Sequence, residues 1–160
     1  MTINTAVILV ASTIVSGCKS SVEDRLISKI NQECGNQTKP GCEIALKAVT
    51  PFEWDKLYFF GAWTTPDSIA EIIGFAYEGD AVPDDYRRIL FVQGTKVVYQ
   101  EDFMPLNYYS STIDFPEMSD SLAQVKTPFL TPDNALFIVD KEKVEDACKE
   151  CFFYSLSIKK

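Results

Sequence analysis

The apolar run from Ile3 to Val15 constrains this chain more than any other feature. Its thirteen residues carry no charge and are mostly small or aliphatic. A helix needs about 20 apolar residues to cross a bilayer, so this run is too short to span one, but it has the length of a signal-peptide core. We therefore expect residues 1–17 to be a cleaved signal peptide that takes no part in the fold.

The four residues that end this run resemble a bacterial lipobox, with the pattern aliphatic, small, small, cysteine. They are Val15, Ser16, Gly17 and Cys18. The resemblance implies cleavage before Cys18 and lipid on its thiol, which would anchor the protein to a membrane. Residues 18–21 would form a lipid-anchored tether and residues 22–160 a single domain. In enterobacteria an Asp directly after the lipidated cysteine favours retention in the inner membrane. Lys19 stands at that position, so it favours the outer membrane, facing the periplasm, if the host follows the same rule.

Four further cysteines predict two disulfide bonds, because an even number in an exported chain is typical of structural disulfides. They are Cys34, Cys42, Cys148 and Cys151. The spacing favours Cys34–Cys42 and Cys148–Cys151, although cross-pairing remains open. Cys148 and Cys151 also form a C-x-x-C motif, which suits thiol–disulfide exchange at a helix start. Here the motif precedes an alternating strand pattern instead, so we favour a structural disulfide over redox activity or zinc.

Composition excludes several functions. The chain has no histidine, which removes Ser-His-Asp and Cys-His catalysis and histidine-ligated metals. Its net charge of -8 argues against nucleic acid, whose binding needs Lys and Arg. No glycine-rich phosphate loop is present, so we expect no cofactor. The acidic segment 78–85 lacks the order of an EF-hand, and we expect a solvated turn and no metal there.

Local signals predict two helices. Ser21 and Asp24 form a capping-box pattern at the start of a helix from Val22 to about Glu33, which Gly35 ends. Thr65 is followed by Pro66, which indicates the start of a second helix that Gly74 closes. Both helices precede long segments with strand patterns.

Alternating apolar residues and turn signals predict the strands. They fall at 44–49, 52–60, 89–92, 96–100, 110–115, 126–130, 135–140 and 152–158. In the 52–60 strand we expect Trp54 and Tyr58 on one face and a central place in the sheet. Short connections favour antiparallel pairing. We expect six or seven of these eight segments to be strands. The expected fold class is therefore α+β, an antiparallel sheet of about six strands with two helices.

The stretch from Phe52 to Tyr58 (Phe-Glu-Trp-Asp-Lys-Leu-Tyr), followed by a Thr-Pro-capped helix, carries a second resemblance. It resembles a set of small bacterial lipoproteins and exported proteins without a settled biochemical function. The resemblance implies an exported domain and supplies no reaction. Asp55 or Lys56 could contact a ligand, but we favour a structural role, since charges beside core residues usually serve solubility or register.

The loop 103–109 is the best candidate for a partner-binding patch, because it combines large apolar side chains with a proline. Its candidate contact residues are Phe103, Met104, Leu106, Tyr108 and Tyr109. The alternative is that these side chains fold over one end of the sheet. The sequence does not decide between these two placements.

Together these features favour a non-enzymatic, lipid-anchored envelope protein that acts by binding another protein. An inhibitor, an immunity protein or an accessory subunit would fit, and the acidic chain suits a basic envelope or exported partner. One alternative is a small periplasmic hydrolase that uses Asp or Glu, which predicts a polar pocket with a carboxyl of raised pKa. Another is a thiol-redox lipoprotein acting through Cys148 and Cys151.

Overall fold

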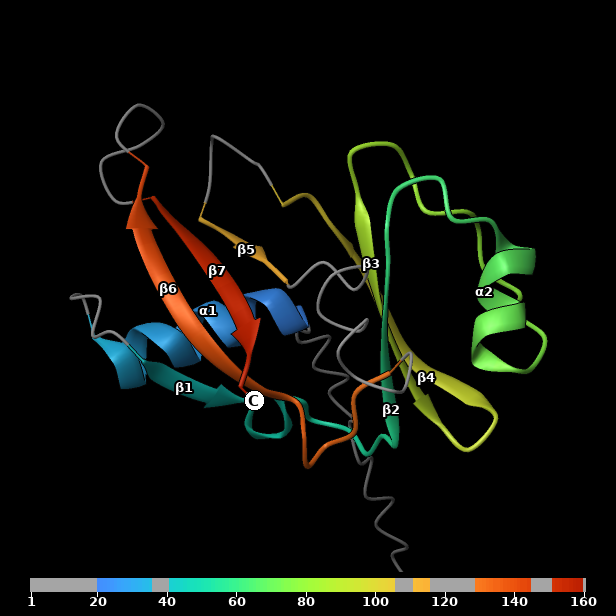
Figure 1. The fold of residues 1–160 in the computed structure, drawn as a ribbon, viewed down its shortest axis with the longest axis horizontal. Coiled ribbons are helices and arrows are strands. Elements are labelled where there is room, and N and C mark those ends of the chain that lie inside the picture. Colours follow the sequence, from blue (N-terminus) through green and yellow to red (C-terminus); the bar gives the residue numbers. More distant parts are fainter. Residues whose placement is uncertain (1–19, 36–40, 106–110, 116–128, 145–150, 160) are drawn as a thin grey trace, which may run out of the picture.

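Two β-sheets lie side by side, and each has one helix against it (Figure 1). The computed structural model describes residues 20–35, 41–105, 111–115, 129–144 and 151–159. In chain order the elements are α1 (Val22–Cys34), β1 (Cys42–Ala45), the 3₁₀ helix η1 (Leu46–Ala48), β2 (Lys56–Phe60), α2 (Pro66–Ile73), β3 (Arg87–Gln93), β4 (Lys96–Phe103), β5 (Thr112–Asp114), β6 (Leu136–Lys143) and β7 (Phe152–Ile158). Among these residues no helix is both long enough and apolar enough to cross a membrane.

The α+β class is confirmed, but the single antiparallel sheet is wrong. The strands form a four-stranded sheet in the order β1-β6-β7-β5 and a three-stranded sheet in the order β2-β3-β4. We call these sheet A and sheet B. β5 runs parallel to β7, while every other strand pair is antiparallel. Parallel pairing needs a long connection, and the chain between β5 and β7, which includes β6, supplies it.

α1 begins and ends as its sequence predicts. Ser21 and Asp24 form the expected capping box, with the Asp24 N–H donating to Ser21 Oγ at 2.9 Å. Leu26 and Ile30 are fully buried, as expected for an amphipathic helix that covers a sheet. Cys34, the last residue of α1, forms a disulfide with Cys42, the first residue of β1, which ties the helix to sheet A.

Lys141 adds a polar attachment between α1 and sheet A. This β6 side chain is 7% exposed, and its Nζ donates to Asn31 Oδ1 of α1 at 2.9 Å. The Nζ also lies 3.9 Å from the ring centroid of Phe152. Tyr154 donates its hydroxyl to the same Asn31 oxygen at 2.9 Å. A buried ammonium needs such partners, because desolvation lowers the Lys141 pKa.

Sheet B has a hydrophobic cluster on each face. Its first face joins α1 and sheet A in a shared core through Leu57, Ile89, Phe91 and Phe103. Its second face packs against α2, which lies on the side away from sheet A (Figure 1). This second cluster contains Tyr58, Phe60, Ile69, Ile73, Leu90 and Val92. α2 starts at the expected Thr65 N-cap and ends at Gly74, whose φ of 85° suits glycine.

The first expected strand, 44–49, is only half right. Ile44 and Leu46 are buried, but the chain turns into η1 at Leu46. There the Leu46 N–H donates to the Ala135 carbonyl at 2.9 Å, and the Val49 N–H donates back to Leu46. The turn brings Val49 into the core and leaves Ala48 exposed, which breaks the alternation.

The second expected strand begins later than predicted, and its faces differ. β2 starts at Lys56, so Trp54 precedes the ladder and its Nε1 donates to Thr50 Oγ1 at 3.0 Å. Trp54 packs in the shared core while Tyr58 packs in the α2 cluster, so the expected common face is wrong. β2 is also an edge strand of sheet B, with a single bridge from Leu57 to Leu130 on its other side.

The strand predictions at 89–92, 96–100, 135–140 and 152–158 are confirmed, and β5 confirms the described part of 110–115. Of the predicted 126–130 strand, Leu130 forms only an isolated bridge. The β3–β4 hairpin turns at Gly94, and β7 spans Phe152–Ile158. The turn between Thr131 and Asn134 is closed by the Asn134 N–H donating to the Thr131 carbonyl at 3.1 Å. Most of the predicted 126–130 strand lies outside the described residues.

Candidate functional site

The segment between β2 and β3, residues 61–86, carries the most unusual backbone in the described chain. We call it the β2–β3 connection. It opens with a four-residue turn, in which the Thr64 N–H and Oγ1 both donate to the Gly61 carbonyl, at 3.3 and 2.7 Å. Trp63 is the third residue of this turn and has a φ of 65°. That position of a type II turn normally holds glycine or asparagine.

Trp63 is also 69% exposed, which is rare for the largest apolar side chain. A left-handed conformation costs a residue with a Cβ roughly 1–2 kcal/mol, and an exposed ring recovers little of that by burial. The turn is held in place by two hydrogen bonds of 3.0 Å, from the Trp63 N–H to the Val82 carbonyl and from the Val82 N–H to Thr64. Strain of this kind, imposed on an exposed aromatic residue, points to function.

A surface hollow of about 460 Å³ lies at the same end of sheet B. Three segments line it: residues 61–62 after β2, residues 85–87 at the start of β3, and residues 104–105 after β4. Tyr86, Met104 and Pro105 give it apolar walls. Asp85, at its rim, is the other non-glycine residue with a positive φ among those described, at 61°. Aspartate tolerates this conformation better than tryptophan does.

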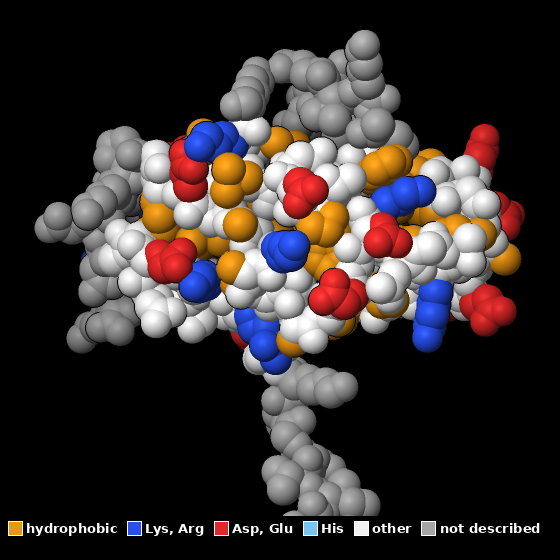
Figure 2. All heavy atoms as spheres, turned by 90° about the horizontal axis from the view of Figure 1, so that it is seen from below, with side chains coloured by type: hydrophobic (Ala, Val, Ile, Leu, Met, Phe, Trp, Pro, Cys, Tyr) orange, Lys and Arg blue, Asp and Glu red, His pale blue; other side chains and the backbone are white. Residues whose placement is uncertain are grey.

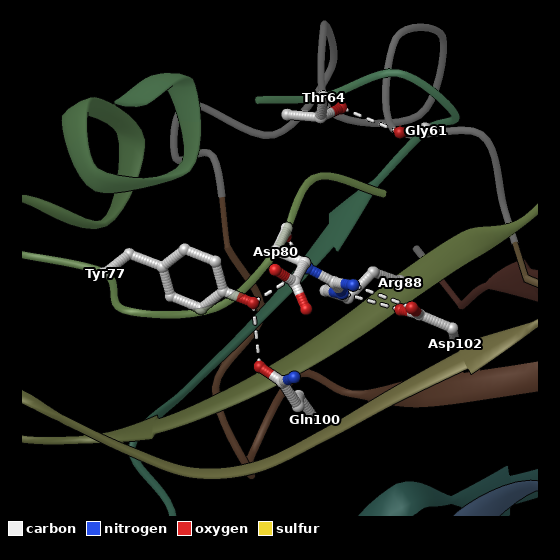
Figure 3. A network of polar contacts seen from close by, with 7 residues as sticks. All are labelled: Gly61, Thr64, Tyr77, Asp80, Arg88, Gln100 and Asp102. Carbon is white, nitrogen blue, oxygen red and sulfur yellow. Dashed lines mark hydrogen bonds and ion pairs between the residues drawn. The ribbon is translucent and has the colours of Figure 1, made fainter. Parts of the chain in front are cut away.

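Arg88 fixes the β2–β3 connection to sheet B (Figure 3). Its side chain is 3% exposed and forms a two-pronged ion pair with Asp102 of β4, at 2.6 and 2.7 Å. It also donates to the Tyr77 hydroxyl at 2.8 Å and to the Asp80 carbonyl at 2.5 Å. Tyr77 in turn donates to Gln100 at 2.8 Å. One buried guanidinium therefore joins three segments of the chain.

The electrostatics of this network agree with its geometry. The hydrogen bonds from Arg88 to Asp102 stabilise the charged guanidinium and raise its pKa, although burial opposes them. Burial raises the pKa of Tyr77 as well, while the neighbouring Arg88 lowers it. Charge-assisted, two-pronged contacts are strong and directional. The network thus attaches the β2–β3 connection to sheet B at Tyr77 and Asp80.

The structure divides the predicted partner-binding residues. Met104 lines the hollow, but Phe103 is 3% exposed and packs edge-on against Phe115 with ring centroids 5.0 Å apart. Phe103 therefore belongs to the shared core and not to a surface patch. Leu106, Tyr108 and Tyr109 lie outside the described residues. Sequence reasoning missed Trp63, although a tryptophan two residues after a glycine and directly before Thr-Thr-Pro was a signal for an aromatic turn.

Asp55 and Lys56 have structural partners. An Asp55 carboxylate oxygen accepts the Gly94 N–H at 2.7 Å and so anchors the β3–β4 hairpin turn. The Lys56 ammonium lies 4.9 Å from the Phe129 ring centroid, a cation–π contact. These contacts support the structural interpretation of both residues.

The cysteines follow the predicted pattern where they are described. The Cys34–Cys42 disulfide is present, with Cα atoms 5.7 Å apart. Cys151 is buried and is itself disulfide-bonded, so it offers no free thiol. Cys18 and Cys148 lie outside the described residues, so lipidation and the Cys148–Cys151 pairing stay predictions. Within the described residues no three His, Cys, Asp or Glu side chains are grouped to hold a metal ion.

The Glu23 carboxyl has a strongly shifted pKa. Burial against β5 raises its pKa to about 7, and the nearby carboxylates of Glu101 and Asp24 act in the same direction. The Ile113 N–H, which donates to Glu23 at 3.3 Å, opposes the shift. Glu101 is engaged with the Val22 N–H and the Tyr99 hydroxyl, at 2.9 and 2.7 Å. The hollow beside Met104 includes neither carboxyl.

No protein-family model, no curated protein and no solved structure matches this chain.

Proposed function

We propose that the protein is a lipid-anchored component of a bacterial envelope that acts by binding another protein. The anchor would be lipid on Cys18 after removal of residues 1–17, and Lys19 favours the outer membrane, facing the periplasm. Trp63 and the adjoining hollow would be the contact surface. Its partner would be an envelope or exported protein, and the role would be that of an inhibitor, an immunity protein or an accessory subunit.

The single observation that carries this proposal is the exposed Trp63 held in a left-handed turn. Tryptophan is enriched among the few residues that dominate binding energy at protein interfaces. The hollow, which is lined by the preceding residue Ala62, presents Tyr86, Met104 and Pro105, and this suits an apolar anchor from a partner. The Arg88 network attaches the later part of the same connection, at Asp80, to sheet B, which limits the conformational entropy that the connection can lose on binding.

The alternatives receive less support. A carboxylate hydrolase would need a carboxyl of raised pKa in a substrate pocket. Glu23 has a raised pKa, but it does not line the hollow beside Met104. Its carboxyl faces the backbone of β5 at Ile113. A thiol-redox role would need accessible thiols, whereas Cys151 is 3% exposed and disulfide-bonded. Neither alternative makes use of Trp63.

The test is site-specific crosslinking of the lipidated protein in its own host. A photoreactive amino acid at Ala62, which lines the hollow, should trap one dominant protein. Trp63→Gly should abolish the crosslink without loss of folded protein. A photoreactive group at the exposed Asp133, on the turn before β6, is the matched control and should trap nothing specific. Equal crosslinking with Trp63→Gly would refute the proposal, as would background labelling alone at Ala62.

A further inference from the structure

We infer that the partner contacts the β2–β3 connection with a cationic surface that surrounds an apolar pocket, and that the contact extends from Trp63 onto α2. This inference rests on the proposed function and states the chemistry of the partner. Two independent properties of the connection support it: the distribution of charge and the placement of exposed apolar side chains.

Charge is concentrated in the β2–β3 connection to an unusual degree. It contains six of the 23 acidic residues of the chain and none of the 15 basic ones. The six are Asp67, Glu71, Glu78, Asp80, Asp84 and Asp85, and all are exposed. The connection thus carries most of the net charge of -8. In Figure 2 acidic side chains lie at the margin that carries α2 (right), with Lys or Arg side chains just inside it and both signs interspersed over the rest of that face.

The exposed apolar residues lie in the same segment. Within the described residues, the large hydrophobic side chains that stay exposed are Trp63, at 69%, and Ile72, at 45%. Ile72 belongs to α2, whose buried stripe is formed by Ile69 and Ile73. It therefore lies outside the stripe that packs on sheet B and follows Glu71 directly. The Trp63 N–H donates a hydrogen bond to the Val82 carbonyl, which places Trp63 near the acidic residue Asp84, two positions after Val82.

Acidic residues together with exposed apolar side chains favour one class of partner. Two copies of the chain that met symmetrically through this surface would bring two equally acidic surfaces together and be repelled. Anionic lipid headgroups and nucleic acids would be repelled for the same reason. A cationic protein gains from both properties, because opposite charge speeds and orients the encounter while buried apolar area supplies affinity. Trp63 and Ile72 would enter apolar sites, and the carboxylates would face Lys and Arg around them.

Synthetic peptides of equal length test the inference on the full mature protein in detergent. The first carries Lys and Arg around Leu and Phe, the second carries Glu in place of Lys and Arg, and the third is basic with Ser in place of Leu and Phe. Tryptophan fluorescence reports binding at Trp63, since the other of the two tryptophans, Trp54, is 4% exposed. The first peptide should bind at least about tenfold more tightly than either other peptide.

Two charge variants distinguish the effect of the acidic residues in the connection from the effect of the net charge of the whole protein. One neutralises four acids of the connection, through Asp67→Asn, Glu71→Gln, Glu78→Gln and Asp84→Asn. The matched variant neutralises four exposed acids elsewhere, through Glu53→Gln, Asp133→Asn, Asp140→Asn and Glu142→Gln. The first set should weaken the basic apolar peptide about tenfold at low salt, and the second should leave its affinity within about twofold.

Three results would overturn the inference: equal binding of the acidic peptide, equal binding of the basic peptide without apolar residues, or equal weakening by both variants. Its failure is distinguishable from failure of the proposed function. A Trp63-dependent crosslink in the host, together with peptides that show no preference for sign, would reject the partner chemistry and retain the binding role. Absence of that crosslink would reject the binding role itself.

Discussion

At the scale of single residues, Trp63 is a residue whose presence the stability of the fold does not explain. Its left-handed backbone is one that glycine adopts freely, and its exposed ring contributes little to the core. Selection for stability alone would favour a smaller residue at this turn. A large residue with a costly backbone conformation and an exposed ring is better explained by a contact with another molecule.

Trp63→Gly should therefore leave the free energy of unfolding unchanged or raise it by up to about 1 kcal/mol. Relief of backbone strain favours the variant, and the greater freedom of glycine in the unfolded chain offsets part of the gain. Urea denaturation of the variant and the native protein measures the difference. A loss of more than about 1 kcal/mol would show that Trp63 supports the fold, and the functional interpretation would then lose its basis.

Glu23 predicts how stability depends on pH. Its pKa is about 7 in the folded chain against an ordinary value of 4.5, so the folded state holds the proton more tightly. The stability that this proton confers is complete below about pH 4.5 and is lost as the pH rises through 7. Glu23→Gln, which mimics the protonated form, should flatten the profile and make the variant more stable above pH 7 by about 1–2 kcal/mol, allowing for solvent screening.

Urea midpoints between about pH 5 and pH 8 measure this effect. Glu53→Gln is the control, because Glu53 is exposed, and it should follow the profile of the native protein. A Glu23→Gln profile parallel to that of the native protein would contradict the assignment.

At the scale of elements, Arg88 decides whether the β2–β3 connection stays on sheet B. Arg88→Met should lower the free energy of unfolding by about 3 kcal/mol, since it leaves Asp102 and the Asp80 carbonyl without their partner. This lies at the low end for a broken buried pair, because the Asp102 side chain is 27% exposed. Hydrogen exchange should increase most over residues 75–86.

Arg25→Met is the matched control for that variant. Arg25 donates a single hydrogen bond to the Ser20 carbonyl at 3.2 Å near the surface, so its loss should cost less than about 1 kcal/mol. Adding Asp102→Asn to Arg88→Met should restore part of the stability, because the unpaired carboxylate is then removed. Equal effects of Arg25→Met and Arg88→Met would contradict the role of the network.

Local sequence signals predicted most helices and strands. The strand ends and the sheet arrangement that these signals did not predict are determined by tertiary contacts. Both helix starts follow from caps that lie within three residues in sequence, at Ser21 and Thr65. The end of β1 and the start of β2 depend on distant hydrogen bonds, from Leu46 to Ala135 and from Asp55 to Val92. The division into two sheets depends on contacts of the same kind, which periodicity does not encode.

The candidate site was predictable only in part, for the same reason. The apolar loop after β4 includes Met104, which lines the hollow. The acidic composition suggested a basic partner, which stays a prediction. Phe103 was misplaced because an apolar residue at a strand end points either into the core or into solvent. Trp63 was missed because its exposure follows from the turn and from its bond to Val82, nineteen residues further on.

At the scale of the whole molecule, the main prediction is that the chain is cleaved before Cys18 and acylated there. Intact mass of the protein purified from its host should correspond to residues 18–160 with added acyl chains. Cys18→Ala should abolish acylation and leave residues 1–17 attached, because the peptidase that recognises a lipobox requires the cysteine. An unacylated native protein with an intact N-terminus would reject the anchor and with it the envelope location.

The placement of β7 has a consequence for the order of folding. Among the described strands it comes last in chain order, yet it lies between β6 and β5 and brings Tyr154 and Leu156 into the shared core. Sheet A therefore stays open until Ile158 has left the ribosome, and the nascent chain has no early stable half on that side. If residues 1–17 direct export, as we propose, this delay has a use, since a polypeptide that cannot close its core during synthesis stays unfolded enough to cross a membrane.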